Sequence, residues 1–304
     1  MATSLASFAE LAAPHMPRIE AALEQSTRFD ADCPAGLQEA IRYSLLAPGK
    51  RLRPLLVLFS AEACGSDPHP AMPAACAVEM VHAYSLIHDD LPAMDDDDLR
   101  RGRPTCHKKY GEATAILAGD ALLARAFELL AAEVRPAAVA AECCRVLAHA
   151  AGATRLVGGQ AADLAGRGED FEGADAAAEL ARLQSIHQRK TGAIFAAAVR
   201  LGGLIAGGTV PQLEALEGFA DRLGLAFQIA DDLLDVSGRQ EVTGKRVGKD
   251  IMRGKLTYPG VLGPRESRRR AAATIDQACA ALAPLGDRAG NLVALARFVG
   301  ERDR

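Results

Sequence analysis

The chain has 304 residues, of which 49% are hydrophobic and 24% charged, and its formal net charge is −4. Its basic residues are dispersed, so no extended positive surface for nucleic acid is expected. The seven cysteines show no zinc-type spacing, no stretch reaches the roughly 18 apolar residues of a membrane span, and the first residues do not resemble a signal peptide, so we expect a cytoplasmic protein with reduced thiols.

Alanine and leucine recur at spacings of three and four, and runs of β-branched residues are missing, so the sequence predicts an all-α single domain over residues 1–304. After a loosely helical start to about residue 25, helices are predicted over residues 34–46, 54–64, a segment ending at Asp89 and Asp90, 113–133, 137–164, 175–204, 211–236, 265–282 and 291–301. Asp175 is the expected N-cap of its helix. Loops are expected at residues 166–173 and, as a mobile charged segment, at 237–255.

The most unusual stretch covers residues 85–102 and holds six aspartates, followed at once by Arg100 and Arg101. Carboxylates this close repel one another, so they require a neutralising cation. All-oxygen ligands favour Mg²⁺ over Zn²⁺, and paired arginines bind phosphate through paired hydrogen bonds. A solvated acidic loop is the alternative, but the run follows a long apolar segment. The stretch therefore predicts a metal-diphosphate site.

A second acidic motif lies at residues 227–236, on the helix before the expected mobile loop. At 100° per residue Gln228, Asp231, Asp232 and Asp235 share one face, while apolar residues line the opposite face. An exposed amphipathic helix shows the same pattern. If the two aspartate clusters face each other, however, they can hold several divalent ions around one diphosphate.

Three basic clusters complete the pattern. Residues 49–54 place three cations at a turn between helices, where an anion can bind. Lys190 stands in mid-helix beside a threonine, and residues 243–255 offer five cations on a glycine-rich loop that suits a lid over phosphates. For each cluster, the alternative is a group of solvent-exposed charges that binds no ligand.

Six motifs follow one another along the chain: Gly49-Lys-Arg-Leu-Arg-Pro, Asp-Asp-x4-Asp followed by Arg-Arg-Gly, Gly158-Gly-Gln, Lys190-Thr-Gly, Gln228-x-x-Asp-Asp-x-x-Asp, and Gly-Lys-x-x-Gly-Lys-Asp. In this order they resemble the motifs of trans-isoprenyl diphosphate synthases, and the chain is most similar to short-chain members of the bacterial farnesyl type. The resemblance covers about residue 37 to the end. It implies an orthogonal helical bundle around a deep central cavity, and usually a homodimer.

The resemblance also implies a reaction, the head-to-tail condensation of isopentenyl diphosphate onto an allylic diphosphate. Three Mg²⁺ ions would be held by Asp89, Asp90, Asp95, Asp231, Asp232 and Asp235. The allylic diphosphate would be bound by Arg100, Lys190, Lys245 and Lys255. The isopentenyl diphosphate would be bound by Lys50, Arg53, His82 and Arg101. Thr191 and Gln228 would steady the carbocation, so the expected catalytic residues are Arg100, Lys190, Thr191 and Gln228.

Product length is expected to depend on the floor of the cavity. Ser85 lies four residues before Asp89, about 6 Å along the helix axis, and Tyr84 lies one residue lower. In the enzymes that the chain resembles, an aromatic residue here accompanies short products, so farnesyl diphosphate is expected. If Tyr84 only packs in the core, geranyl diphosphate and geranylgeranyl diphosphate remain as alternative products.

Two other classes of protein share part of this pattern. A class I terpene cyclase also ionises a diphosphate, but it needs aromatic walls to steady and fold carbocations. This chain is 4% aromatic and has no tryptophan. A non-catalytic subunit of the same fold is expected to lack aspartates or arginines from one motif, and both aspartate motifs are complete here.

Overall fold

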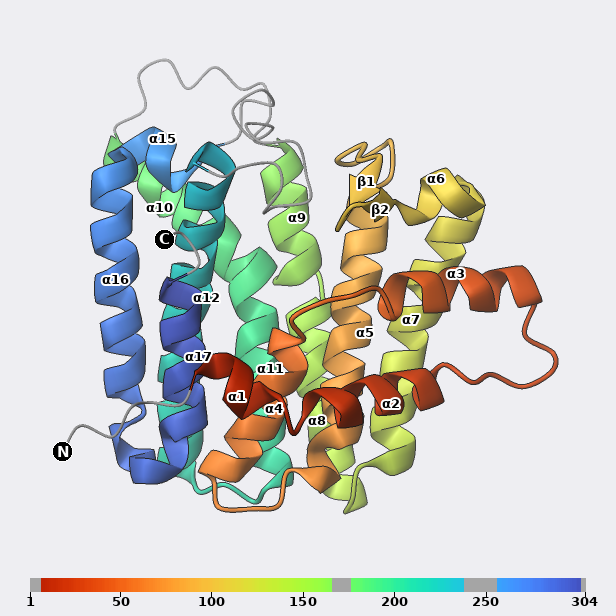
Figure 1. Ribbon diagram of the computed structural model, residues 1–304, viewed down its shortest axis with the longest axis horizontal. Helices are drawn as coiled ribbons and strands as arrows, with labels where there is room; N and C mark the ends of the chain where they lie inside the picture. Colours follow the sequence, from red (N-terminus) through yellow and green to blue (C-terminus); the bar gives the residue numbers. More distant parts are fainter. Residues whose placement is uncertain (1–6, 166–175, 238–255, 302–304) are drawn as a thin grey trace.

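The computed structural model describes residues 7–165, 176–237 and 256–301, and within these ranges regular structure is almost entirely helical (Figure 1). The predicted all-α fold is confirmed. In chain order the elements are α1 (Phe8–Ala12), α2 (Met16–Ser26), α3 (Ala35–Leu45), α4 (Leu52–Ala63), η1 (His69–Ala71), α5 (Met72–Asp89), β1 (Leu99–Arg100), β2 (Arg103–Pro104), α6 (Cys106–Tyr110), α7 (Glu112–Glu133), α8 (Ala137–Ala151), α9 (Leu156–Ala165), α10 (Ala176–His187), η2 (Gln188–Gly192), α11 (Ala193–Ile205), α12 (Val210–Ser237), α15 (Tyr258–Leu262), α16 (Pro264–Ala281), η3 (Ala283–Ala289) and α17 (Gly290–Gly300).

Helix α5 lies at the centre of the bundle. Residues 74–81 are all buried, because apart from Glu79 this part of the helix is apolar on every side and a helix of that kind must be enclosed. It packs against α4 and α7 along its length, and also contacts α2, α3 and α11. As a result its last residue, Asp89, is delivered to the interior of the molecule.

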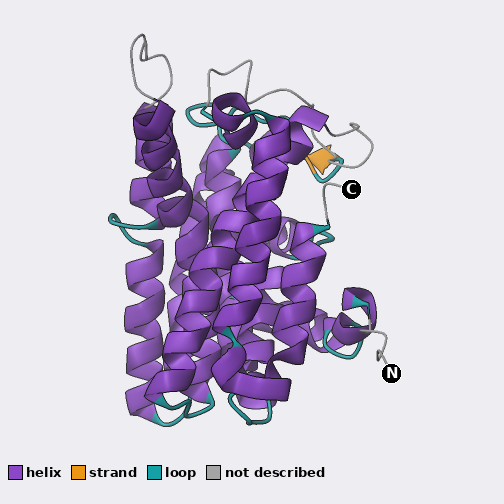
Figure 2. Ribbon diagram, turned by 90° about the vertical axis from the view of Figure 1, so that its left-hand side faces the viewer, coloured by secondary structure: helices purple, strands orange, loops and turns teal. Residues whose placement is uncertain are grey.

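The helices take two main directions. α5, α7, α12 and α16 stand upright in Figure 1, while α2 and α3 lie across α5 and α7. Figure 2 shows the long helices side by side, with the strand hairpin toward one end of the bundle. The C-terminal ends of α5 and α12, which carry the two aspartate motifs, both point to that end (Figure 1).

Small residues allow the closest helix contacts. A Cβ atom on Gly202 of α11 would lie 2.1 Å from the carbonyl oxygen of Val57 in α4, so any side chain there would push these two helices apart. The buried side chains form one large core and a smaller cluster between α10, α12, α15 and α16. In the described part of the chain, no helix is both long and apolar enough to cross a bilayer. The single-domain organisation stays a prediction.

Two predicted helices are interrupted. The helix expected over residues 137–164 is two helices, since α8 ends at Ala151, Gly152 is extended (ψ −172°), and α9 begins at Leu156. Alanine on both sides hid this break, although glycine commonly marks a helix end. The helix expected over residues 175–204 contains the π-helical turn η2 between α10 and α11. Asp175 and the loop expected at 166–173 lie outside the described residues, as does the loop expected at 237–255 except for Ser237, which ends α12.

The antiparallel hairpin β1/β2 was not predicted. Arg101 and Gly102 connect its strands with φ values of 52° and 74°, the left-handed conformation that two-residue hairpin turns require. Strands of two residues are too short to produce an alternating sequence pattern. The hairpin sends Arg100 and Arg101 to different partners, as described below.

Candidate active site

A cavity of about 830 Å³ lies where the C-terminal ends of α5 and α12 approach the turn before α4. Both carboxylates and basic side chains line it. The predicted site residues that line it are Lys50, Arg53, His82, Asp89, Asp95, Arg100, Arg101, Lys190, Thr191, Gln228, Asp231, Asp232 and Asp235. Five of the six sequence motifs lie within the described residues. Four of these five contribute residues to the lining of the cavity.

The first aspartate motif folds back on the end of α5. The amide of Asp95 donates to the carbonyl of Asp89 at 2.8 Å, and the amide of Asp97 donates to the carbonyl of Asp90 at 3.1 Å. Six positions do not match a whole number of helical turns, so a continued helix would separate Asp89 from Asp95. The reversal places both on the wall of the same cavity.

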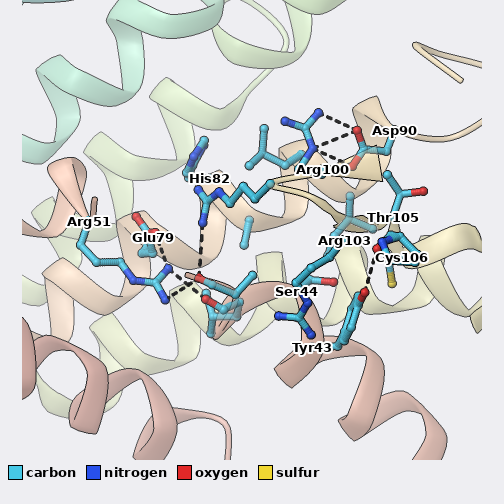
Figure 3. A pocket seen from close by; sticks show the side chains of 17 residues that line it. Tyr43, Ser44, Arg51, Glu79, His82, Asp90, Arg100, Arg103, Thr105 and Cys106 are labelled. Atoms are coloured by element: carbon cyan, nitrogen blue, oxygen red, sulfur yellow. Dashed lines mark hydrogen bonds and ion pairs between the residues drawn. The ribbon is translucent and has the colours of Figure 1, made fainter. Parts of the chain in front are cut away.

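Asp90 is buried and binds Arg100 (Figure 3). Arg100 Nε donates to the two carboxylate oxygens at 2.9 and 2.7 Å, and Nη2 donates to Oδ1 at 2.5 Å. Burial lowers the pKa of Arg100, but its bonds to Asp90 outweigh this effect and the pKa is raised, so the guanidinium stays charged. Asp90 does not line the large cavity but a neighbouring one of about 50 Å³. Its role as a metal ligand stays a prediction.

Lys190 is held between two carboxylates. It lies on the π-helical turn η2, and its Nζ is 3.1 Å from Asp163 Oδ2 and 3.8 Å from Asp89 Oδ2. Burial lowers the pKa of Lys190, but the charges of the two carboxylates raise it by more. The pKa therefore lies above its ordinary value. Burial raises the pKa of Asp89, and the charge of Lys190 offsets part of that rise. The cation therefore stabilises an otherwise unfavourable buried carboxylate.

The basic turn before α4 is built on Arg51. This residue has a left-handed backbone (φ 47°), is 3% exposed, and donates to Glu20 at 2.8 Å, to Glu79 at 2.9 Å, and to two backbone carbonyls where α3 ends. Figure 3 shows the pair with Glu79. Removing one partner of such a buried pair leaves an uncompensated charge. The pair therefore fixes the turn that presents Lys50 and Arg53 to the cavity.

Arg101 lies against the same turn. Its Nη1 donates to the carbonyl of Pro48 at 2.7 Å, and a Cβ atom on Gly49 would lie 2.5 Å from that nitrogen. Only glycine at position 49 permits this approach. Burial, together with the charges of Arg53 and Arg101, lowers the pKa of His82 well below its usual value. His82 is therefore neutral at physiological pH.

The three aspartates of the second motif differ in how exposed they are. Asp231 is exposed, Asp235 is half-buried and Asp232 is 4% exposed. Beside them, Thr191 Oγ1 donates to Gln228 Oε1 at 2.9 Å, which joins η2 to α12. The predicted pair of cation-steadying residues is thus in direct contact.

Tyr84 and Ser85 do not line the large cavity. Tyr84 is 6% exposed, and its ring lies edge-on to His88 with centroids 5.7 Å apart. Ser85 Oγ donates to the carbonyl of His82 at 2.9 Å. Their predicted control of chain length stays a prediction, as do the roles of Lys245 and Lys255, which lie outside the described residues.

Asp163 and Asp97 line the cavity and were not singled out from the sequence. Asp97 was hidden among its neighbours in the acidic run. Asp163 stands three positions after the Gly-Gly-Gln motif, and its side chain is 18% exposed. In the sequence, Asp163 could have been noticed as a single acidic residue in an apolar helix. Only the folded chain shows that its partner is Lys190.

The donors that face the cavity suit a hard divalent cation, because they are carboxylate oxygens without a cysteine or histidine cluster. In residues 7–165, 176–237 and 256–301, no three such acidic, histidine or cysteine side chains already converge on one point. Mg²⁺ does not need such a cage, since it is usually held by one or two carboxylates together with water and substrate phosphates. Asp89, Asp95 and Asp231 therefore fit Mg²⁺ bound with a diphosphate.

Comparison with known proteins agrees with this geometry. The model of the polyprenyl synthetase family matches residues 34–283. The farnesyl diphosphate synthase of Geobacillus stearothermophilus is 48% identical over 248 residues, or 81% of each chain. Geranylgeranyl pyrophosphate synthase 11 of Arabidopsis thaliana is 48% identical over 88% of this chain and 75% of its own. The structure of an FPP/GFPP synthase from Zymomonas mobilis superposes with a TM-score of 0.84 at 37% identity, covering 96% of this chain and 98% of that one. The chain belongs to the polyprenyl synthetase family and is a prenyltransferase.

Burial raises the pKa of the Tyr84 phenol to about 12, and the charge of Asp89 adds to this rise. A raised pKa stabilises the fold below the unfolded value near 10, and this stabilisation is lost as the pH rises toward 12. We expect the unfolding free energy of the wild type to fall relative to that of Tyr84→Phe between pH 9 and pH 11.5. Urea unfolding of both proteins measures this, and the other groups cancel in the difference. A constant difference would contradict the prediction.

Proposed function

We propose that the protein catalyses the Mg²⁺-dependent head-to-tail condensation of isopentenyl diphosphate with dimethylallyl and geranyl diphosphate, giving farnesyl diphosphate. One observation carries this proposal: a single cavity is lined by two aspartate clusters and by two separate basic groups. Two basic groups match two diphosphates, one on each substrate. A terpene cyclase has only one diphosphate substrate, so it does not need a second basic group.

The allylic diphosphate is bound on the side of the aspartates. Arg100 and Lys190 contribute charges that oppose those of its phosphates, and both cations are already positioned by carboxylates. Asp89, Asp95, Asp231 and Asp235 would hold three Mg²⁺ ions, with Lys245 and Lys255 as further phosphate ligands. Bound Mg²⁺ neutralises the diphosphate and so favours its departure.

The isopentenyl diphosphate is bound at the basic turn. Lys50, Arg53 and Arg101 supply charge, and neutral His82 supplies one hydrogen-bond donor without adding further repulsion among the arginines. This arrangement keeps the nucleophilic double bond close to the allylic carbon, which removes much of the entropic barrier to condensation.

The carbocation formed after ionisation is steadied by oxygen dipoles. The hydroxyl of Thr191 donates a hydrogen bond to Gln228, so the lone pairs of that hydroxyl can face the positive carbon. The departed pyrophosphate then takes the proton that is lost as the new double bond forms. No side chain is assigned as the base.

We also propose a cytoplasmic homodimer. Free cysteines in the described residues fit a reducing compartment. Ile116 and Leu117 on α7 are 44% and 56% exposed, and adjacent exposed apolar residues suit a subunit interface. Light scattering of the purified chain measures its molar mass, and a monomer at micromolar concentration would contradict the dimer.

The test of the reaction is a product analysis. Purified protein, Mg²⁺, isopentenyl diphosphate and dimethylallyl diphosphate are expected to give a fifteen-carbon alcohol after dephosphorylation, and a chelator is expected to abolish it. Asp89→Asn and Asp231→Asn should each lower turnover roughly 1000-fold, because each removes a ligand charge from the transition state. Asp30→Asn, an exposed site between α2 and α3, is the matched control. Absence of product from any allylic primer would overturn the proposal.

Chain length is tested at Tyr84. If its ring limits the growing tail, Tyr84→Ala should shift the product toward twenty carbons, while Tyr84→Phe, which keeps the ring, should leave the product unchanged. Chromatography of the dephosphorylated products measures both. An unchanged product from Tyr84→Ala would assign the floor of the cavity to other residues, and a twenty-carbon product from the wild type would favour geranylgeranyl diphosphate.

A further inference from the structure

Asp232 differs from the other aspartates of its motif. It is 4% exposed, and each of its carboxylate oxygens accepts a hydrogen bond. Oδ1 accepts from Gln228 Nε2 at 3.1 Å, and Oδ2 accepts from the backbone amide of Tyr258 at 3.0 Å. Gln228 in turn accepts from Thr191 at 2.9 Å. Four residues on three elements thus form one chain of hydrogen bonds.

The bond to Tyr258 joins two distant segments. Tyr258 is the first residue of α15, so its amide is one of those that an α-helix leaves without an intrahelical partner. The tyrosine is fully buried and packs in the smaller core with Ile229 and Leu233 of α12. Because a buried amide needs an acceptor, the carboxylate of Asp232 stabilises the docking of α15 on α12.

The bond to Gln228 sets the direction of an amide. A carboxylate only accepts hydrogen bonds, so Gln228 must turn its NH₂ group toward Asp232 and its carbonyl oxygen toward Thr191. The two side chains are four positions apart on α12 and therefore on one face. If the amide were reversed, its NH₂ group would face Thr191, and the threonine hydroxyl would lose its acceptor.

We infer that Asp232 is a positioning residue that orients Gln228, and through it Thr191, and ties α15 to α12, whereas Asp231 is the metal ligand at this end of the motif. The inference rests on the proposed function for the meaning of the Thr191 orientation. It differs from the prediction made from the sequence, which treated the aspartates on this helix face alike. The contacts distinguish them.

The test compares Asp232→Asn with Asp231→Asn and with the double variant Asp232→Asn/Gln228→Glu. In Asp232→Asn an NH₂ group replaces one acceptor, so either Tyr258 or Gln228 loses its bond. In the double variant the introduced carboxylate at 228 accepts from Thr191 and from the introduced amide at 232, whose carbonyl still accepts from Tyr258. The double variant therefore restores the connectivity and keeps the total charge.

Two readouts need no turnover. Hydrogen exchange of the Tyr258 amide, followed by mass spectrometry of peptides covering residues 256–262, reports the link to α15. Calorimetric titration with inorganic pyrophosphate in Mg²⁺ reports the metal site. For Asp232→Asn we expect pyrophosphate binding within about twofold of wild type. If the Tyr258 bond is lost, its amide should exchange roughly tenfold faster or more, and if the Gln228 bond is lost, kcat should fall at least about tenfold. For Asp231→Asn we expect weakened pyrophosphate binding and unchanged exchange.

The double variant should return the exchange of Tyr258 to the wild-type rate. Unchanged exchange together with an unchanged kcat in Asp232→Asn, or a loss of pyrophosphate binding equal to that of Asp231→Asn, would overturn the inference, as would failure of the double variant to restore the property that Asp232→Asn had changed. A failure of the proposed function is seen separately, because wild-type protein would then neither bind pyrophosphate with Mg²⁺ nor form product.

Discussion

Repulsion among carboxylates is the constraint on which the site depends. Asp89, Asp95, Asp97, Asp231 and Asp235 surround one cavity, and burial raises the pKa of Asp89. No fold gains stability from such an arrangement, since charges of one sign in a poorly solvated place disfavour the ionised state. Half-buried cations offset part of the repulsion. Lys190 lies between Asp89 and Asp163, and Arg100 binds Asp90.

The same cations give the site its second property, which is preorganisation. A cation already bound to a carboxylate keeps its position when a diphosphate arrives, so little side-chain entropy is lost on binding. The basic turn follows the same principle through Arg51, which is fixed by Glu20 and Glu79 and in turn fixes its neighbours. Helix α5 supports both regions, because it is enclosed on every side.

We proposed different parts of the molecule for the chemistry and for the length of the product. The charged wall serves any allylic diphosphate, and relatives of this chain that are 48% identical to it include both a farnesyl and a geranylgeranyl synthase. In the proposed function, the length of the product depends on the packing below Asp89, where Tyr84 lies against His88.

The sequence by itself determined the helical class, the acidic and basic motifs and, by resemblance, the family, because helical periodicity and charge spacing are local properties. It could not determine which aspartates are bound by other groups of the protein. Asp90 and Asp232 have the same chemistry as Asp89 and Asp231, yet Arg100 and the amide of Tyr258 bind them inside the protein. The hairpin and the break at Gly152 were likewise missed, since their local signals are weak. Only the tertiary structure decided these points, because the partners of each side chain come from segments distant in the sequence.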